Sequence, residues 1–385
     1  MNGNALSEAG GPNVVLGHDW LTGMRGGERV LELLCAAFPH APLVSLLGQP
    51  ETVSAIIRER PLQFSRLQRI PGITRRYRHL LPLMPLAASR LRVPPCDLLL
   101  TTSHCVAKSF RPPPGARHLC YCFTPMRYAW LFGREYLGPT KALLAAPLLG
   151  WLRRWDARTA NRVDRFVAIS RHVRGRIERF YGREADVVYP PVDIVRCTPT
   201  PGRGASPAEG RFDLIVSALA PYKRIDLAVR AYSRLGWPLK VVGTGTETAA
   251  LQAMAADNIE FLGWRSDADV LALYRSCRLL IFPGEEDFGI VPLEAMACGR
   301  PVVAYARGGA LETVEDGHTG VLFVEQQEAC LLDAVSRAAV ARWDVGMIRA
   351  HAERFGTDRF VVELARCVSR TLRHDSASPV GRDRT

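Results

Sequence analysis

The sequence predicts an α/β protein made of two doubly wound domains, and three observations lead to that fold class. Short apolar runs typical of buried strands alternate with helix patterns along two separate stretches of the chain. Residues 197–211, rich in Pro, Gly, Ser and Ala, interrupt this alternation and mark a linker or surface loop. At 385 residues the chain is also too long for one ordinary α/β core. Ligands bind at the carboxyl edges of such sheets, so we expect the site in a cleft between the domains.

The first domain is expected over residues 1–196. Its first strand, Val14–Gly17, leads through His18, Asp19 and a glycine-rich loop into a helix over residues 28–38. Ser170 is a suitable N-cap for a later helix. Further strands are predicted over residues 97–103, 118–122, 165–169 and 187–189, with that later helix over 171–181.

The second domain is expected over residues 197–356, where the alternation starts again. Residues 357–385 are predicted to hold a helix over 358–372 that crosses back to the first domain, followed by a disordered polar tail. Within the second domain, strands are predicted over residues 214–216, 239–242, 259–262, 279–282 and 301–304, with helices over 225–235, 247–256 and 267–276.

The composition is typical of a soluble globular protein, with 48% hydrophobic and 23% charged residues. No apolar stretch reaches the roughly 20 residues that a bilayer span needs, and the N-terminus lacks the basic start and apolar core of a signal peptide. The ten cysteines lie scattered through apolar runs, without a CxxC pair or a Cys/His quartet. We therefore expect buried free thiols in a cytoplasmic protein rather than disulfides or a metal site.

The positive charge is concentrated in the first half of the chain. Residues 1–200 hold 28 Lys/Arg against 14 Asp/Glu, whereas the remainder is slightly acidic. A basic stretch over residues 66–79 is followed by several apolar residues over 80–86. Such a combination favours a peripheral position on an anionic membrane surface, here the inner face of the plasma membrane, and a merely arginine-rich surface is the alternative. No nucleic-acid partner is expected, because no helix-turn-helix, RNP-like or zinc-finger pattern occurs.

Two glutamates, Glu286 and Glu294, stand eight positions apart in the segment that carries most chemistry. The segment follows a predicted strand and enters a helix, for which Pro292 suits the first turn and Gly299 the end. Free backbone N–H groups at such a helix start bind anionic ligands. Two carboxylates at the same place accept hydrogen bonds from ligand hydroxyls. The segment therefore predicts a phosphorylated, hydroxyl-rich ligand, such as a nucleotide sugar.

Two cations, Lys223 and Arg224, follow another predicted strand and precede a helix. A diphosphate bound at this edge of the sheet would meet them, and they would offset the charge that builds on a departing nucleoside diphosphate. The alternative is a solvated helix start, although cations are disfavoured at a helix N-terminus.

These segments resemble family-4 retaining glycosyltransferases of the GT-B fold, in which two Rossmann-like domains face a central cleft. In the first domain, residues 120–130 (CYCFTPMRYAW) and 187–193 (VVYPPVD) resemble the WbaZ-like mannosyltransferase subgroup. The resemblance extends over residues 14–370. In the second domain it rests on Glu286-x7-Glu294 with Phe288-Gly289, on Pro221-Tyr222-Lys223-Arg224, and on Gly308-Gly309-x-x-Glu312 with Asp316-Gly317-x-Thr319-Gly320.

The resemblance implies roles for individual residues. Glu286 would face the donor sugar beside its anomeric carbon, Lys223 with Arg224 would bind the diphosphate, and Glu294 would hold the ribose hydroxyls; Glu286 and Lys223 are the implied catalytic residues. Trp264 would lie near the base, with core packing as the alternative. The other implied donor-binding residues are Asp287, Phe288, Gly289 and Ile290 around the helix start, and Gly26, Gly27 and Gly243 at close approaches. Asp19, Thr124 and Arg127 are expected on the acceptor side.

The resemblance also implies a reaction. A hexose, mannose from GDP-mannose according to the subgroup, would pass with retention to a lipid-linked glycan acceptor in the synthesis of a bacterial surface polysaccharide such as O-antigen (lipopolysaccharide), capsule or exopolysaccharide. A UDP-sugar donor is the alternative. The leaving phosphate oxygen would take the acceptor's proton, so no cofactor and no metal are expected. Asp267-x-Asp269 matches the metal motif of another glycosyltransferase architecture by letter, but after Ser266 it is predicted to cap a helix.

Two positions depart from the family pattern. Phe123 stands where many relatives have a histidine that touches the donor sugar, and Ala218 stands where many have an arginine. His104 is a candidate substitute for the missing imidazole, with a purely structural histidine as the alternative. The departures support a second hypothesis, a non-catalytic GT-B protein that binds a glycan or a partner enzyme.

Overall fold

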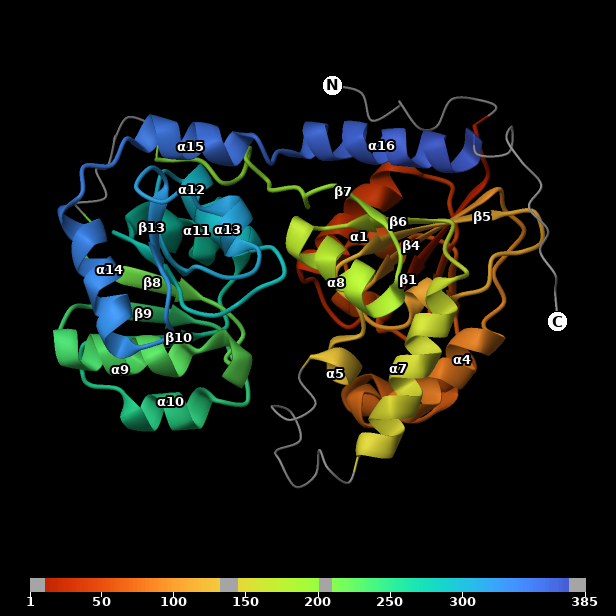
Figure 1. The fold of residues 1–385 in the computed structure, drawn as a ribbon, viewed down its shortest axis with the longest axis horizontal. Coiled ribbons are helices and arrows are strands. Elements are labelled where there is room, and N and C mark those ends of the chain that lie inside the picture. Colours follow the sequence, from red (N-terminus) through yellow and green to blue (C-terminus); the bar gives the residue numbers. More distant parts are fainter. Residues whose placement is uncertain (1–10, 132–144, 201–209, 374–385) are drawn as a thin grey trace. The chain divides into compact units, whose positions relative to one another are not determined.

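The computed structural model describes residues 11–131, 145–200 and 210–373, and it divides into two compact units. Unit 1 holds the residues up to Val188 together with those from Val361 onward, and unit 2 holds Tyr189–Phe360 (Figure 1). The predicted boundary after residue 196 therefore differs from the observed one. Residues 189–196 belong to unit 2, where the Val192 N–H donates to the Phe355 carbonyl at 2.9 Å. The predicted tail lies outside the described residues.

Unit 1 is built on a parallel sheet. Its seven described strands stand in the order β3-β2-β1-β4-β5-β6-β7. The strands are β1 (Val14–His18), β2 (Leu43–Ser45), β3 (Leu62–Phe64), β4 (Leu98–Ser103), β5 (Arg117–Cys122), β6 (Arg165–Ala168) and β7 (Ala185–Val187).

Helices connect these strands, as parallel pairing requires. Ser170 caps α8 as predicted, because its Oγ accepts the Val173 N–H at 3.0 Å. The helices are α1 (Gly26–Ala37), α2 (Ala55–Arg58), α3 (Ile73–Arg76), α4 (Met84–Arg90), α5 (Arg127–Trp130), α7 (Ala146–Ala160) and α8 (Arg171–Tyr181), with 3-10 turns η2 (Pro50–Thr52), η3 (Arg66–Arg69), η4 (Tyr77–Leu83) and η5 (Ala107–Ser109). Most of α16 (Thr357–Arg373) lies in this unit, where Arg370 pairs with Asp186 of β7 at 3.4 Å.

Unit 2 repeats the plan with the strand order β10-β9-β8-β11-β12-β13, again parallel throughout. The strands are β8 (Asp213–Val216), β9 (Leu239–Val242), β10 (Ile259–Gly263), β11 (Leu280–Phe282), β12 (Val302–Tyr305) and β13 (Gly320–Phe323). The helices are η7 (Pro221–Lys223), α9 (Ile225–Leu235), α10 (Thr248–Met254), α11 (Asp267–Ser276), α12 (Ile290–Ala297), α13 (Ala310–Thr313), α14 (Glu328–Val340) and α15 (Val345–Glu353).

Both sheets explain the apolar runs of the sequence. Helices cover both faces of a parallel sheet, so its central strands read as continuous apolar segments, such as the buried Val14–Leu16 of β1 and Leu279–Ile281 at β11. In each sheet the strand order reverses once, between β1 and β4 in unit 1 and between β8 and β11 in unit 2. Loops diverge at such switch points and leave room for ligands. The predicted fold class of two doubly wound α/β domains is confirmed.

Sequence reasoning missed the short outer elements. β2 and β3 have three residues each, too few to show a periodic pattern, and β13, α14 and α15 were not predicted. The predicted strand over 187–189 occurs as Ala185–Val187, and α1 begins two residues before the predicted start. None of the described helices is long and apolar enough to cross a bilayer.

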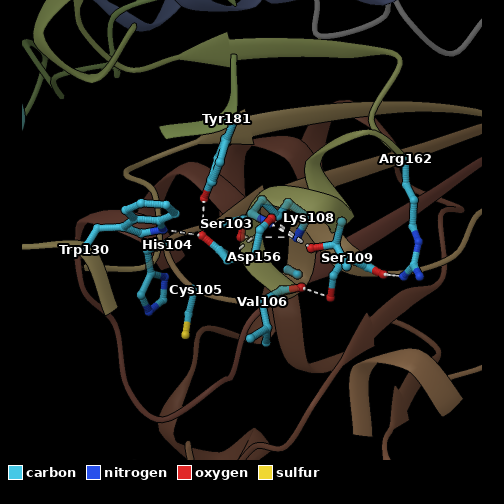
Figure 2. A network of polar contacts seen from close by, with 12 residues as sticks. Ser103, His104, Cys105, Val106, Lys108, Ser109, Trp130, Asp156, Arg162 and Tyr181 are labelled. Atoms are coloured by element: carbon cyan, nitrogen blue, oxygen red, sulfur yellow. Dashed lines mark hydrogen bonds and ion pairs between the residues drawn. The ribbon is translucent and has the colours of Figure 1, made fainter. Parts of the chain in front are cut away.

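A buried polar network ties the helices of unit 1 together (Figure 2). The ammonium of Lys108 lies 2.9 Å from Asp156 Oδ1, and both side chains are fully buried. Asp156 Oδ2 accepts hydrogen bonds from Trp130 Nε1 and from the Tyr181 hydroxyl, each at 2.8 Å. Burial, and then the charge of Asp156, raise the pKa of Tyr181 well above its ordinary value, so the hydroxyl remains a donor. One carboxylate thus joins η5, α5, α7 and α8.

Candidate active site

The switch point of the unit 2 sheet brings an acid and a base together. Lys223 lies in the loop after β8, Glu286 lies in the loop after β11, and the two side chains form an ion pair. They are 14% and 18% exposed, so the pair is screened from solvent yet accessible. Gly284 makes the approach possible, because a Cβ there would lie 2.7 Å from the Lys223 carbonyl oxygen. The predicted catalytic residues therefore meet at the place where α/β sheets bind ligands.

A third loop holds Glu286 in place. Gly308 and Gly309 follow β12, Gly308 pairs with Glu286 as a parallel bridge, and the Gly309 N–H donates to the Glu286 carbonyl at 2.8 Å. A Cβ on Gly309 would overlap the backbone of Phe288. The glycine pair that appears in the sequence motif is thus needed for close packing of two loops.

The start of α12 supplies backbone donors beside this pair. Gly289 occupies the N-cap position with φ +102°, a conformation that side chains rarely adopt. The Phe288 ring is buried and stacks on Tyr189 with centroids 5.5 Å apart, so it anchors the loop. Asp287 is also buried. Backbone N–H groups at a helix start such as that of α12 can bind an anion, and this role for Ile290 stays a prediction.

Glu294 projects from the second turn of α12. The Tyr274 hydroxyl donates to its Oε2 at 3.0 Å, and Arg196 lies 3.4 Å from its Oε1. Burial, and then the charge of Glu294, raise the pKa of Tyr274 well above its ordinary value, which keeps the hydroxyl protonated as a donor. Sequence reasoning missed both partners, since Tyr274 shows only a helix pattern and Arg196 was assigned to the other domain.

Arg224 does not share the position of Lys223. Its guanidinium turns to Asp226, with Nε 3.1 Å from Oδ1, and to Gln326 at 3.2 Å. In this structure its charge is therefore paired with Asp226, and its binding of the diphosphate stays a prediction. Arg224 is the one described non-glycine residue with positive φ, at 53°. Such strained backbone costs about 1–3 kcal/mol and tends to occur at functional sites.

Two further donor-side predictions have clear positions in unit 2. Gly243 follows β9 with φ +132°, and a Cβ there would overlap the Ser217 carbonyl, so the glycine lets the loops after β8 and β9 pack together. Trp264 follows β10 and is 75% exposed. The core-packing alternative for Trp264 is therefore wrong, and its ring is available for stacking at the carboxyl edge of the sheet.

The unit 1 predictions surround the other switch point. Asp19 is fully buried, and its oxygens accept the N–H groups of four consecutive residues, His104 to Ala107, at 2.6–3.0 Å. Asp19 was expected on the acceptor side. Because it is fully buried and its oxygens accept these N–H groups, it instead holds the loop after β4 in shape. Gly26 and Gly27 form the first turn of α1. Thr124 is buried near Arg176, and Arg127 begins α5.

The Asp267-x-Asp269 segment lies at a helix start, and Ser266 caps that helix as predicted. Ser266 Oγ accepts the Asp269 N–H at 3.2 Å, and Asp269 accepts in return from Ser266, so the capping prediction is confirmed. Over residues 11–131, 145–200 and 210–373, no three His, Cys, Asp or Glu side chains gather as metal ligands would. All ten cysteines are free, and eight of them are buried.

Residues 202–339 match the model of a protein family described as glycosyl transferases group 1. An uncharacterized glycosyltransferase of Methanocaldococcus jannaschii is 30% identical over 164 residues, which cover 41% of this chain and 45% of that protein. A D-inositol 3-phosphate glycosyltransferase of Salinispora tropica is 33% identical over 243 residues, or 52% of this chain and 50% of the relative. The chain spans about half the length of the curated relatives it matches. These matches support the similarity of this chain to group 1 glycosyltransferases. The family-4 and WbaZ-like assignments stay predictions.

Solved structures match nearly the whole chain at low identity. HepE of Anabaena in complex with UDP and glucose has a TM-score of 0.68 at 19% identity, covering 93% of this chain and 99% of that one. The lipopolysaccharide outer core galactosyltransferase WaaB, in its apo form, has a TM-score of 0.64 at 16% identity, with coverage of 93% and 99%. These likenesses show the fold, and they confirm its assignment to the GT-B class.

Proposed function

We propose that this chain is a retaining glycosyltransferase that moves a hexose from a nucleotide sugar to a glycan acceptor, starting from the match of residues 202–339 to glycosyl transferases group 1. The observation that carries the proposal is the Lys223–Glu286 pair at the switch point of the unit 2 sheet, beside the start of α12. An ammonium and free N–H groups suit a diphosphate, and carboxylates suit sugar hydroxyls.

The pair also indicates how a donor is received. Without ligand, Lys223 and Glu286 neutralise each other. An arriving diphosphate carries more negative charge than one carboxylate and competes for Lys223, which releases Glu286 toward the donor sugar. Lys223 then offsets the charge that grows on the leaving nucleoside diphosphate, so catalysis rests on positioning and electrostatics. Tyr274 and Arg196 hold Glu294, which supports its proposed role of accepting from the ribose hydroxyls.

GDP-mannose is the proposed donor, on the subgroup resemblance of residues 120–130 and 187–193. A UDP-sugar is the alternative, and it is favoured by the UDP complex of the HepE structure. A donor panel assayed by nucleoside diphosphate release tests the choice, with the highest rate expected for GDP-mannose. No release from any GDP-sugar would contradict the mannose choice, and release from UDP-sugars would establish the alternative. No binding of any nucleotide by calorimetry would favour the non-catalytic GT-B protein that Phe123 and Ala218 suggest.

The proposed acceptor is a lipid-linked glycan of a bacterial surface polysaccharide, met at the inner face of the plasma membrane. A surface of unit 1 supports this. Its consecutive elements η3, α3, η4 and α4 contact one another and expose both arginines and large apolar side chains. We call it the basic–apolar surface; its exposed members are Arg66, Arg69, Ile70, Arg76, Leu83 and Leu86.

Reversing two charges of the basic–apolar surface, Arg66→Glu with Arg69→Glu, is expected to weaken binding to vesicles rich in phosphatidylglycerol by about 30-fold or more, since each cation near such a surface contributes about 1 kcal/mol. Vesicle flotation at low salt measures the effect. The matched control reverses the exposed Arg174 and Arg179 of α8 and should bind like the wild type. Equal loss in both double variants would indicate net charge alone and would contradict a specific membrane surface.

A further inference from the structure

Two buried cysteines of unit 2 lie against each other, although they are far apart in the chain. Cys197 belongs to the segment that leads into this unit, and Cys298 is the C-cap residue of α12. Each residue is 1% exposed, and neither is part of a disulfide. A hydrogen bond joins the two thiols. The proposed transfer reaction uses neither of them, so the pair is a reactive group that still lacks a role.

One arginine fixes the backbone on both sides of the thiol pair. Arg349 of α15 donates through Nη1 to the Cys197 carbonyl at 3.1 Å and to the Ala297 carbonyl at 2.7 Å. Its Nη2 donates to the Ile194 carbonyl at 3.3 Å. Because Ala297 precedes Cys298, the backbones of both cysteines flank the same guanidinium. The fold therefore holds the two sulfurs together without a covalent bond.

The surroundings make Cys298 the more reactive sulfur of the two. The hydrogen bond from Cys197 lowers the pKa of the Cys298 thiol despite its burial; Arg275 and Arg300 act in the same direction, while Glu294 opposes them. The same hydrogen bond, and then burial, raise the pKa of Cys197, so this thiol keeps its proton as the donor. A thiolate reacts with peroxide far faster than a thiol does. Cys298 is therefore the sulfur that is oxidised first, with Cys197 in place to attack it.

The thiol pair adjoins the carboxylate that is proposed to hold the donor's ribose. Glu294 stands one turn before Cys298, and its carbonyl accepts the Cys298 backbone N–H at 3.2 Å. Arg196 precedes Cys197 in the chain and lies 3.4 Å from Glu294 Oε1. The side chains of Arg196 and Glu294 are 34% and 20% exposed, so the buried thiols lie beside groups that solvent and small molecules reach.

We propose that Cys197 and Cys298 form a reversible disulfide, which draws Arg196 onto Glu294 and thereby weakens nucleotide binding. The disulfide depends on the two thiols alone, whereas its effect on nucleotide affinity rests on the proposed function of Glu294. The sulfurs of a disulfide are about 2 Å apart, well inside the distance between two hydrogen-bonded thiols. Closing that gap pulls the segment around Cys197 toward α12, and Arg196 moves with it. Arg196 then engages Glu294 Oε1 more closely, so a ribose hydroxyl loses this oxygen as an acceptor.

Hydrogen peroxide is the oxidant of the proposed step. The Cys298 thiolate attacks one peroxide oxygen, so that an S–O bond forms and the O–O bond breaks. The departing hydroxide takes up the proton that Cys298 gave up and leaves as water. The Cys197 sulfur then attacks the sulfur of the Cys298 sulfenic acid, which forms the S–S bond and breaks the S–O bond. This second hydroxide leaves as water with the Cys197 proton, so two thiols are oxidised and one peroxide is reduced.

Peptide mapping of the full chain tests the disulfide without any ligand. The chain is treated with hydrogen peroxide, its remaining thiols are alkylated, and it is digested without reductant. A linked pair of peptides that contain Cys197 and Cys298 is expected, and dithiothreitol should abolish it. The matched control is Cys330→Ser, at a more exposed cysteine of the same unit, which should leave the link intact. Absence of the linked pair, or a link from Cys298 to another cysteine instead, would overturn the proposal.

Calorimetry with GDP and UDP, before and after oxidation, tests the effect on the nucleotide. The affinity of the nucleotide that binds is expected to fall about fivefold to tenfold on oxidation, the effect of one hydrogen bond, and dithiothreitol should restore it. Peroxide should leave the affinity of Cys197→Ser unchanged, whereas Cys330→Ser should respond like the wild type.

The two measurements separate the two parts of the proposal. Unchanged affinity in a chain whose link the peptide map has verified would refute the effect on Glu294. Failure of both nucleotides to bind the reduced chain would contradict the proposed function, and with it the effect on affinity. The peptide map would still decide whether Cys197 and Cys298 form a disulfide, because it needs no nucleotide.

Discussion

Replacing Lys223 by Ala is expected to lower the rate of hexose transfer by about 10²–10³, the range found when one group that stabilises developing charge is removed. Lys223 pairs with Glu286 at the switch point of the unit 2 sheet, whereas the neighbouring Arg224 turns to Asp226 and Gln326. The variant should also weaken nucleoside diphosphate binding. Removal of the Lys223 ammonium leaves the Glu286 carboxylate without this partner where the diphosphate arrives. Repulsion between the two negative groups is then added to the lost attraction.

Glu286→Gln should separate binding from transfer. The change removes the competitor for Lys223, so nucleoside diphosphate affinity should be unchanged or higher. Transfer should still fall by about 10²-fold, because the donor sugar loses a charged acceptor near its reacting carbon. Calorimetry with the nucleoside diphosphate and initial rates with the donor measure the two effects.

A second ion pair of the same unit provides the matched control. Arg230 Nε lies 2.9 Å from Glu328 Oε1, on α9 and α14. Arg230→Ala and Glu328→Gln should therefore leave transfer and nucleotide affinity unchanged. Full activity in both Lys223→Ala and Glu286→Gln would refute the catalytic assignment, and equal loss in the control variants would show that stability rather than chemistry was measured.

Asp156→Ala is expected to lower the free energy of unfolding of unit 1 by about 3–5 kcal/mol, the usual cost of breaking a buried ion pair from one side. Lys108 would remain fully buried with an uncompensated charge, and Trp130 Nε1 and the Tyr181 hydroxyl would lose their acceptor (Figure 2). Urea unfolding followed by tryptophan fluorescence measures the change, and Trp130 reports on the affected region.

The double variant Lys108→Met with Asp156→Leu should recover the part of this loss that comes from the unpaired Lys108 charge, because apolar replacement of a whole buried pair is often neutral. Trp130 Nε1 and the Tyr181 hydroxyl still lack their acceptor in this variant. Glu32→Ala, which removes the surface pair of Glu32 with Arg29, should cost less than about 1 kcal/mol. An Asp156→Ala variant as stable as Glu32→Ala would mean that the network contributes little to stability. Because the network holds α5, residues near Arg127 should also exchange their amide hydrogens faster in Asp156→Ala.

The sequence predicted the parts of the candidate site that depend on local pattern. A strand, a loop and a helix start around Glu286 can be read from the apolar run, Pro292 and Gly299, and Lys223 from its place between a strand and a helix. The Ser266 cap of Asp269 is equally local, and it was predicted correctly. Such features lie within a few residues of one another, so the backbone preferences of those residues determine them.

Pairings across the fold were not predictable in the same way. The Arg224 guanidinium donates to both Asp226 and Gln326. Gln326 is about a hundred residues away, and nothing in the sequence near Arg224 indicates this contact. The burial of Asp19 under four backbone N–H groups depends on β1 and β4 lying side by side, although they are far apart in the chain. Arg196 was placed in the wrong domain, because a proline-rich segment marks a connection without showing which side it packs on.

The sequence by itself determined that this protein has two doubly wound α/β domains and a loop–helix segment suited to a nucleotide sugar. It did so because alternating apolar runs and punctuating Gly and Pro residues act over short distances. Only the tertiary structure decided that Lys223 and Glu286 are partners, that Trp264 is exposed, and that His104 pairs with Asp19. These facts follow from strand order, since a switch point joins loops that are separated by tens of residues in the chain.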